Sequence, residues 1–380
     1  MDYIFFQHYW WAILSLLGGI LVFLLFVQGG QGLLYVIGQN DAERNTIAYS
    51  LGRKWGLTFT TLVTFGGAFF ASFPLFYSTS FGGAFYVWML ILLVFVIQAV
   101  GYEFRNMPNN FLGDRTFSAF LQINGILAPL LLGTAVATLF TGAQFSVNRF
   151  TLTEIGTYNT ISVWSTPWRG LDALLDYRNL SLGLAVLFLS RVLGLQYFIN
   201  DIDDATIVER SRKRLLCSSA CFLVFFLLFA VSLLLSKGYA VDRATGIISV
   251  EKYKYLHNLL QMPIVAVVFL VGVVSVLWGI WIGAMKASRC AIWFSGAGTV
   301  ITVCALLLLA GWNNTAYYPS LTDMQSSLTI FNSSSSKFTL EAMSIVSLLI
   351  PFVLAYIWYV WRSMNSKQVT LKEVEEESGY

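Results

Sequence analysis

Two uncharged apolar segments follow one another between residues 53 and 105, and they constrain the fold more than any other part of the chain. Each is about 20 residues long, the length at which a helix crosses the roughly 30 Å hydrocarbon core of a bilayer. The first begins after Arg53 and Lys54, the second ends just before Glu103 and Arg105, and the turn between them carries no charge. Because a backbone in lipid must satisfy its own hydrogen bonds, this pattern predicts a helical hairpin that crosses a membrane twice.

The rest of the chain is also rich in apolar residues and poor in charged ones. Of the 380 residues, 57% are hydrophobic and only 11% are charged, which is typical of a polytopic membrane protein. The net charge of +3 is small and dispersed, so nucleic acid is not an expected partner. The first apolar run lacks a basic leader and a small-residue cleavage site, so it is expected to remain as a helix. Apolar windows predict nine spans, at residues 10–36, 57–77, 82–101, 117–142, 180–200, 215–236, 261–285, 290–311 and 342–361.

The distribution of cations predicts the orientation. If the loop after the first span is cytoplasmic, 14 of the 23 Lys and Arg residues lie on that side and eight on the other. The last one, Arg191, falls within a span. We therefore expect one integral membrane domain over residues 1–380, with the N-terminus outside and residues 362–380 forming a cytoplasmic tail.

The outer loops and the cysteines add two expectations. Loops 143–179, 237–260 and 312–341 are long enough for short surface helices, and the Ser/Asn-rich stretch 332–336 predicts a turn with a Ser or Thr cap before the last span. The four cysteines all fall inside predicted spans, so disulfides are not expected: Cys217, Cys221, Cys290 and Cys304.

Several motifs occur in a characteristic order along the chain. They are Lys54-Trp55, Gly66-Gly67-Ala68, Phe73-Pro74, Tyr77, Phe81-Gly82-Gly83 and Gly101 to Arg105 in the hairpin, Asn40 to Arg44 before it, Leu139 to Gly142 with Phe145-Ser146-Val147 after the fourth span, and residues 326–361 near the end. Their order and spacing closely resemble subunit II of the cytochrome bd quinol oxidases. This is a family resemblance, and no physical rule yields the name.

The resemblance implies a fold of two four-helix bundles plus one additional helix, paired with a similarly folded subunit I in a bacterial inner membrane. It implies a respiratory complex that oxidises quinol and reduces oxygen to water, electrogenically and without pumping protons. Haem b and haem d are expected on subunit I, so this chain is expected to contain no catalytic residue and to ligate no haem or metal. A bound quinone or lipid and a small accessory subunit stay open, as does the choice between ubiquinol and menaquinol. A transporter or scaffold without a redox role is the alternative.

The chain departs from the family pattern where carboxylates are common. After the first span it reads Gln28-Gly29-Gly30-Gln31-Gly32, and Trp55 is followed by Gly56. An amide has no titratable proton to relay, so a proton route through this chain is in doubt.

The candidate polar route consists of residues at or near membrane depth: Gln28, Gln31, Trp55, Thr58, Thr61, Thr64 and Gln98. The alternative is packing, because a mid-helix threonine often bonds back to its own helix and a buried amide often joins two helices.

The charged candidates are few. Arg191 is expected to need a partner, for which an acid or a haem propionate of subunit I is the hypothesis and snorkelling to the interface the alternative. Glu103 and Arg105 are expected to form a solvated pair at a helix end. His8 and His257 fall at the outer ends of spans or in loops, where they are expected to be interfacial rather than axial haem ligands.

Overall fold

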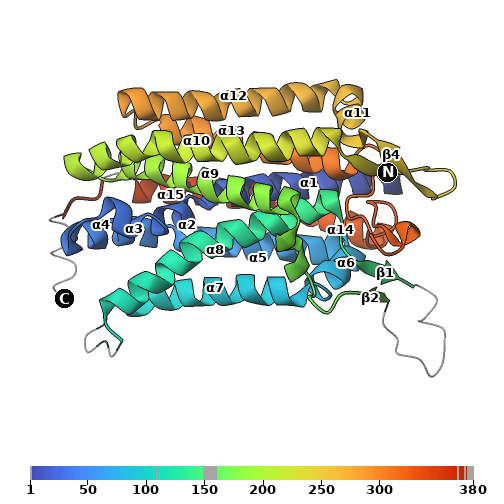
Figure 1. Ribbon diagram of the computed structural model, residues 1–380, viewed down its shortest axis with the longest axis horizontal. Helices are drawn as coiled ribbons and strands as arrows, with labels where there is room; N and C mark the ends of the chain where they lie inside the picture. The colour runs from blue at the N-terminus through green and yellow to red at the C-terminus, as the bar shows by residue number, and fades with distance from the viewer. Residues whose placement is uncertain are drawn as a thin grey trace.

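Long helices lie side by side and form the whole body of the molecule (Figure 1). The computed structural model describes residues 2–105, 107, 110, 112–148, 161–365, 368–371 and 374. Within these residues, eight helical segments are long and apolar enough to cross a membrane, and a bent pair over Asp41–Ser72 and Pro74–Phe81 brings the number to nine if it counts as one span. The predicted all-α polytopic fold is therefore confirmed.

The first half of the chain contributes four spans. The helices are α1 (Tyr3–Leu24), continued by α2 (Phe26–Gln31), then α3 (Leu34–Ile37), α4 (Asp41–Gly52), α5 (Trp55–Ser72), α6 (Pro74–Phe76), the π-helix η1 (Tyr77–Phe81), α7 (Phe85–Phe104) and α8 (Asp114–Thr141). The first span starts at residue 3 rather than at the predicted residue 10, because Tyr3 to Tyr9 belong to the same helix.

The second half contributes four further spans and a last one. These are α9 (Tyr177–Asp201), α10 (Ala205–Leu235), α12 (Pro263–Lys286) and α13 (Ala291–Gly311), followed by α14 (Lys337–Ser347) and α15 (Ile350–Met364). The last two count together as one span. Ser336 caps α14 by accepting a hydrogen bond from the Thr339 N–H, so the predicted turn and cap before this span are confirmed.

The predicted second span, 57–77, is wrong at its end. Helix α5 stops at Ser72 and the chain turns by 115° before α6 and η1. Pro74 causes the stop, since proline has no N–H to continue the ladder and disfavours helical geometry in the preceding residue, Phe73.

The outer loops contain strands as well as short helices. Strand β1 (Phe145–Val147) pairs antiparallel with β2 (Ser162–Trp164), and β3 (Lys237–Val241) pairs with β4 (Ile248–Lys252). The expected surface helices are present as α11 (Lys254–Gln261) and two 3-10 turns, η3 (Leu171–Leu175) and η4 (Met324–Ser326). Both strand pairs and the N-terminus lie at one end of the bundle, which we call the N-terminal face (Figure 1).

The opposite end, which we call the C-terminal face, contains α4, the end of α7, the start of α8 and the end of α15 (Figure 1). Part of the predicted tail 362–380 lies outside the described residues. Its described part is not free: Val369 forms a parallel bridge with Ile202, and its N–H donates to the Asp201 carbonyl at 2.9 Å. The first tail residues, Arg362 to Met364, still belong to α15.

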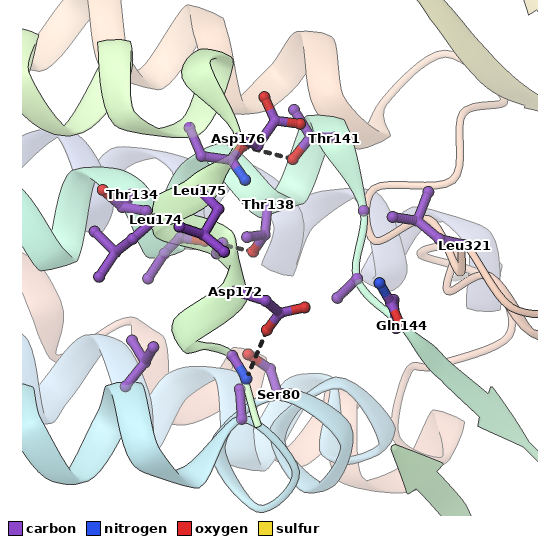
Figure 2. A pocket seen from close by; sticks show the side chains of 18 of the residues that line it. Ser80, Thr134, Thr138, Thr141, Gln144, Asp172, Leu174, Leu175, Asp176 and Leu321 are labelled. Carbon is purple, nitrogen blue, oxygen red and sulfur yellow. Dashed lines mark hydrogen bonds between the residues drawn. The ribbon is translucent and has the colours of Figure 1, made fainter. Parts of the chain in front are cut away.

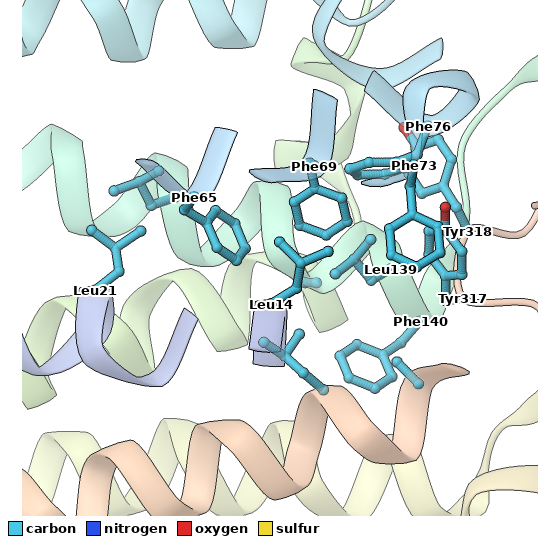
Figure 3. Packing of buried hydrophobic residues seen from close by; sticks show 14 of the residues in the cluster. Leu14, Leu21, Phe65, Phe69, Phe73, Phe76, Leu139, Phe140, Tyr317 and Tyr318 are labelled. Carbon is cyan, nitrogen blue, oxygen red and sulfur yellow. The ribbon is translucent and has the colours of Figure 1, made fainter. Parts of the chain in front are cut away.

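A cluster of rings near the N-terminal face forms the apolar centre of the first half (Figure 3). Trp11 packs against Phe69, Phe73 and Tyr317, with the Tyr317 ring centroid 4.5 Å away. Phe76 lies against Tyr317 from the bend after α5. We call these five residues the aromatic core. The bend at Pro74 therefore contributes to this packing, because it places the rings of Phe73 and Phe76 against Tyr317.

Candidate functional site

Helix α2 is the element that carries the candidate amides into the bundle. All six of its residues are buried, and it packs against α8 and α9. Gly29 makes this approach possible, since a Cβ there would meet the Ser190 carbonyl oxygen at 1.9 Å. The glycine-rich stretch after the first span therefore places Gln28 and Gln31 in the interior instead of forming an exposed turn.

Gln28 and Gln98 meet between α2 and α7. The Gln28 Nε2 donates to the Gln98 Oε1 at 3.4 Å, and both side chains are fully buried. Gln28 Oε1 and Gln98 Nε2 have no hydrogen-bond partner among the described residues. Each amide thus keeps one polar atom that a water or another ligand can satisfy.

Gln31 pairs with Tyr102, a residue that was predicted only as part of a motif and not as part of the route. The Gln31 Nε2 donates to the Tyr102 hydroxyl at 2.8 Å, and Trp55 stacks on the Tyr102 ring at 5.8 Å. The structure therefore brings Gln31 and Trp55 together through Tyr102. We call Gln28, Gln31, Gln98 and Tyr102 the amide site.

The threonines of α5 do not continue this polar arrangement. Thr58 is fully buried and donates to the Leu24 carbonyl at 3.0 Å, where the chain passes from α1 to α2. Thr61 and Thr64 donate to carbonyls of their own helix, those of Leu57 and Thr60. These hydroxyls are used for packing and for helix back-bonding, in agreement with the alternative considered for them.

The expected pair of Glu103 and Arg105 is wrong. Glu103 is exposed, whereas Arg105 is buried and donates to Ser118 Oγ at 3.1 Å and to Asn45 Oδ1 at 2.7 Å. Arg105 lies where α7 ends, so its side chain joins α4 and α8 instead of pairing with a neighbour two residues away, which would lie on another side of the helix.

Arg191 has no carboxylate partner in the described part of the chain. Its guanidinium lies over the Phe188 ring at 5.4 Å, and its buried Nε has no hydrogen-bond partner there. The side chain is half-buried rather than extended to a helix end. The hypothesis that a second subunit supplies its partner stays untested.

Both histidines lie near the N-terminal face, and each has a hydrogen-bond partner within this chain. His8 Nδ1 lies 2.9 Å from the Ile4 carbonyl, and its ring packs edge-on against Trp312 and Phe331. His257 Nδ1 lies 2.6 Å from Glu251 Oε1. The described residues contain no group of three His, Cys, Asp or Glu side chains that could hold a metal ion. That this chain ligates no haem stays a prediction.

A buried ionic cluster at the C-terminal face was not predicted. Asp201 accepts hydrogen bonds from Arg53 at 3.0 Å, from Tyr197 at 3.1 Å and from Ser50. The Lys54 side chain is fully buried beside it and lies over the Trp361 ring at 4.7 Å. Hydropathy carries no signal for this cluster, because Asp201 is 148 residues from Arg53 and 151 residues from Ser50 in the chain.

A cavity of about 320 Å³ opens toward the N-terminal face between α7, α8 and η3 (Figure 2). Its wall combines the Asp172 carboxylate with the hydroxyls of Ser80, Thr134 and Thr138. Asp172 Oδ1 accepts a hydrogen bond from the Gly170 N–H at 3.2 Å, so one carboxylate oxygen is left for solvent. The cavity is polar and roomy enough for ordered water, and it lies apart from the amide site.

Comparisons with known proteins assign the family. The model of the family described as cytochrome bd terminal oxidase subunit II matches residues 6–364. The chain belongs to this family. It is 26% identical to cytochrome bd-I ubiquinol oxidase subunit 2 of Escherichia coli K12, over all of this chain and 99% of that protein. It is 27% identical to a probable cytochrome oxidase subunit 2 of Haemophilus influenzae, over 95% and 94% of the two chains.

Two further comparisons extend this picture. The cytochrome bd ubiquinol oxidase subunit 2 of Bacillus subtilis is 25% identical, over 89% of this chain and 88% of that protein. The solved structure of bd oxidase from Geobacillus thermodenitrificans has the same fold, with a TM-score of 0.55 at 13% identity and 99% coverage of both chains. The chain is thus a membrane subunit of a cytochrome bd-type oxidase, and the transporter alternative is not supported.

Proposed function

We propose that this subunit II is the non-catalytic partner of a haem-bearing subunit I, with which it oxidises quinol and reduces oxygen to water. On this proposal haem b and haem d are held by subunit I, the reaction is electrogenic without proton pumping, and this chain supports the fold of its partner. The family match over residues 6–364 supports the complex. The observation that carries the supporting role is an uncovered face of α5.

This face combines small and hydroxylated residues with two large apolar ones, Val63 and Phe70, and nothing in the described chain covers it. A Cβ added at Gly56 or Gly67 would meet no atom within 4 Å, and Thr60 and Thr64 between them are exposed. Small residues at helix spacing let a second helix approach closely in a membrane. Exposed apolar residues of α7 such as Met89 and Leu93 continue this surface. We infer that helices of subunit I pack here.

The purified complex tests this proposal directly. Gly67→Leu fills the surface with a bulky side chain and is expected to prevent co-purification of subunit I, whereas Val267→Phe, on an exposed part of α12, leaves it intact. The two-subunit complex is expected to show b-type and d-type haem bands, and subunit II expressed alone no stoichiometric haem. Loss of the haem spectrum on joint substitution of His8 and His257 would contradict the assignment of both haems to subunit I.

Arg191 is proposed to pair with an acid or a haem propionate of subunit I. Its unpaired Nε and the lack of a nearby carboxylate in the described chain support this. Arg191→Gln in the purified complex is expected to shift a haem midpoint potential. If the haem midpoint potentials of the variant complex are unchanged, the propionate is excluded as the partner of Arg191. If the yield of the two-subunit complex is unchanged as well, the acid is also excluded.

The orientation is proposed from the excess of cations. The N-terminal face is assigned to the periplasm and the C-terminal face to the cytoplasm of a bacterial inner membrane. Cysteines introduced at Thr245 and at Glu209, in a background without the four native cysteines, are expected to label from opposite sides. Labelling of Glu209→Cys by an impermeant reagent on intact spheroplasts would reverse the assignment.

A further inference from the structure

A groove between α13 and α15 opens at the C-terminal face, and no role described above uses it. It encloses about 500 Å³. Leu354 and Ile357 line its apolar part. Near the end of α15 it is lined by Trp358, Trp361, Arg362 and Asn365, together with Trp293, which packs against Trp361. The groove is therefore amphipathic along its length, with its polar groups gathered at one end.

Polar atoms at this end have no partner. Trp361 Nε1 and Asn365 Oδ1 are both buried, and neither makes a hydrogen bond within the described part of the chain. The first is a donor that needs an acceptor, and the second is an acceptor that needs a donor. Leaving such groups unpaired costs about 1–3 kcal/mol each, and a ligand that offers an acceptor and a donor would remove this cost.

The end of the groove is also positively charged. Lys54 is fully buried behind Trp361, and its Nζ has no hydrogen-bond partner in the described chain. Arg53 and Lys54 share one carboxylate, that of Asp201, which binds Arg53 at 3.0 Å, and no described carboxylate lines the groove beside the exposed Arg362. The buried cluster therefore keeps one positive charge in excess, and an anion at the mouth of the groove would reduce the cost of burying it.

The apolar part identifies the kind of anion. Leu354 and Trp358 face outward on the least buried span of the molecule, where acyl chains of the bilayer surround the helix. Tryptophans at a helix end mark the depth of lipid headgroups, and basic pockets between membrane helices bind acidic headgroups. A free phosphate would leave the apolar part unfilled, whereas a phospholipid fills both parts.

We propose that this groove binds one anionic phospholipid with a hydroxylated headgroup, of the phosphatidylglycerol type. Its phosphate accepts hydrogen bonds from Arg362 and Trp361 Nε1, a headgroup hydroxyl donates to Asn365 Oδ1, and Lys54 supplies a second positive charge from behind. The acyl chains run along Leu354 and Ile357 into the bilayer. The site thereby fixes the end of α15 against the Arg53–Lys54 segment.

Native mass spectrometry of the purified two-subunit complex, delipidated and then exposed to phosphatidylglycerol or phosphatidylcholine micelles, tests this proposal. The wild-type complex is expected to retain one phosphatidylglycerol in preference to phosphatidylcholine. Arg362→Gln is expected to weaken that retention about fivefold, the effect of one cation near a headgroup. Trp361→Phe keeps the ring and removes only the donor, and it is expected to weaken retention by a similar factor.

A matched control comes from the same face. Lys286 also lies over a tryptophan, Trp281, at 5.2 Å, but it is exposed and does not line the groove, so Lys286→Met is expected to leave lipid retention unchanged. Arg362 is exposed, so its variant folds even if Lys54→Met does not. Equal retention of the two lipids, unchanged retention in both groove variants, or displacement of the lipid by excess inorganic phosphate would each overturn the proposal. The experiment measures bound lipid and not oxidase turnover, so its result tests the lipid site independently of the proposed function.

Discussion

The aromatic core and the amide site are both buried between helices, but they differ in whether their side-chain polar atoms have hydrogen-bond partners. In the aromatic core every polar group has a partner: the Tyr317 hydroxyl pairs with Ser333 Oγ at 2.7 Å, and Trp11 Nε1 donates to the Leu307 carbonyl at 3.1 Å. In the amide site Gln28, Gln31 and Gln98 each keep an atom without a partner in the described chain. The difference teaches that the first region stabilises the bundle, whereas the second is poorly explained by stability alone.

The largest expected effect comes from removing the centre of the aromatic core. Trp11→Ala deletes a ring that is 2% exposed and packs against Phe69, Phe73 and Tyr317, so it leaves a cavity. We expect the free energy of unfolding of the purified complex to fall by about 3–5 kcal/mol. Trp168→Ala, at an exposed residue, is the control and is expected to change it little. Equal losses in the two variants would remove the distinction between core and surface.

The amide site is expected to respond less and in a different manner. Gln98→Leu leaves the Gln28 Nε2 without an acceptor, and we expect a loss of about 1–3 kcal/mol in unfolding free energy. Replacing both residues by Leu removes the unpaired group, so the double variant is expected to recover most of this loss. A double-mutant cycle on the purified complex measures the coupling. Additive losses would mean that the 3.4 Å contact does not couple the two amides.

The sequence predicted the spans better than it predicted what joins them. Hydropathy located the middle of each span, because uncharged length is what lipid requires. It missed the 115° break at Phe73, although Pro74 was visible, since two apolar segments on either side of a proline look like one span. It also missed both strand pairs, because β1 and β2 are three residues long and pair across a loop.

The candidate site was predicted in its residues but not in its contacts. Gln28, Gln31 and Gln98 stood out as amides at membrane depth, and the structure does bring Gln28 to Gln98. The Tyr102 contact and the Arg53–Asp201 pair were invisible in the sequence, because each joins residues from helices whose relative rotation hydropathy does not determine. Glu103 and Arg105 were predicted to form a pair because they are close in the sequence. In the structure only Arg105 is buried, because it packs between α4 and α8.

A smaller and pH-dependent effect is expected beside the aromatic core, at the outer hairpin. The hydrogen bond from His257 and the neighbouring Lys254 ammonium outweigh partial burial and lower the pKa of the Glu251 carboxyl. A carboxyl with a lowered folded-state pKa stabilises the fold above its unfolded pKa, near 4.3, and this contribution is lost as the pH falls through the folded value. Because the group is partly exposed and screened, we expect less than about 1 kcal/mol.

Hydrogen exchange of the β3–β4 amides in the purified complex measures this contribution. Glu251→Gln is expected to speed exchange at neutral pH, and the difference from wild type is expected to shrink as the pH falls below about 4.3. Glu341→Gln, at an exposed acid on α14, is the control and is expected to leave the hairpin unchanged. A difference that grows on acidification would reverse the sign of the linkage.

The smallest expected effect concerns proton supply through the amide site. Protons that reach a buried oxygen-reducing centre need titratable or hydrated stations, and Gln28 and Gln31 offer only amides, which have no titratable proton. Thr58 is occupied by the Leu24 carbonyl and Thr61 by its own helix, so neither hydroxyl is free to lead a proton toward the amides. The main route should then run through subunit I. Thr58→Val with Thr61→Val is expected to keep quinol oxidase turnover within about threefold at equal haem content, a change of under about 0.7 kcal/mol in the barrier. A hundredfold fall, roughly 2.7 kcal/mol, would instead place the conducting path in this subunit, and would make the unpaired atoms of the amide site part of it.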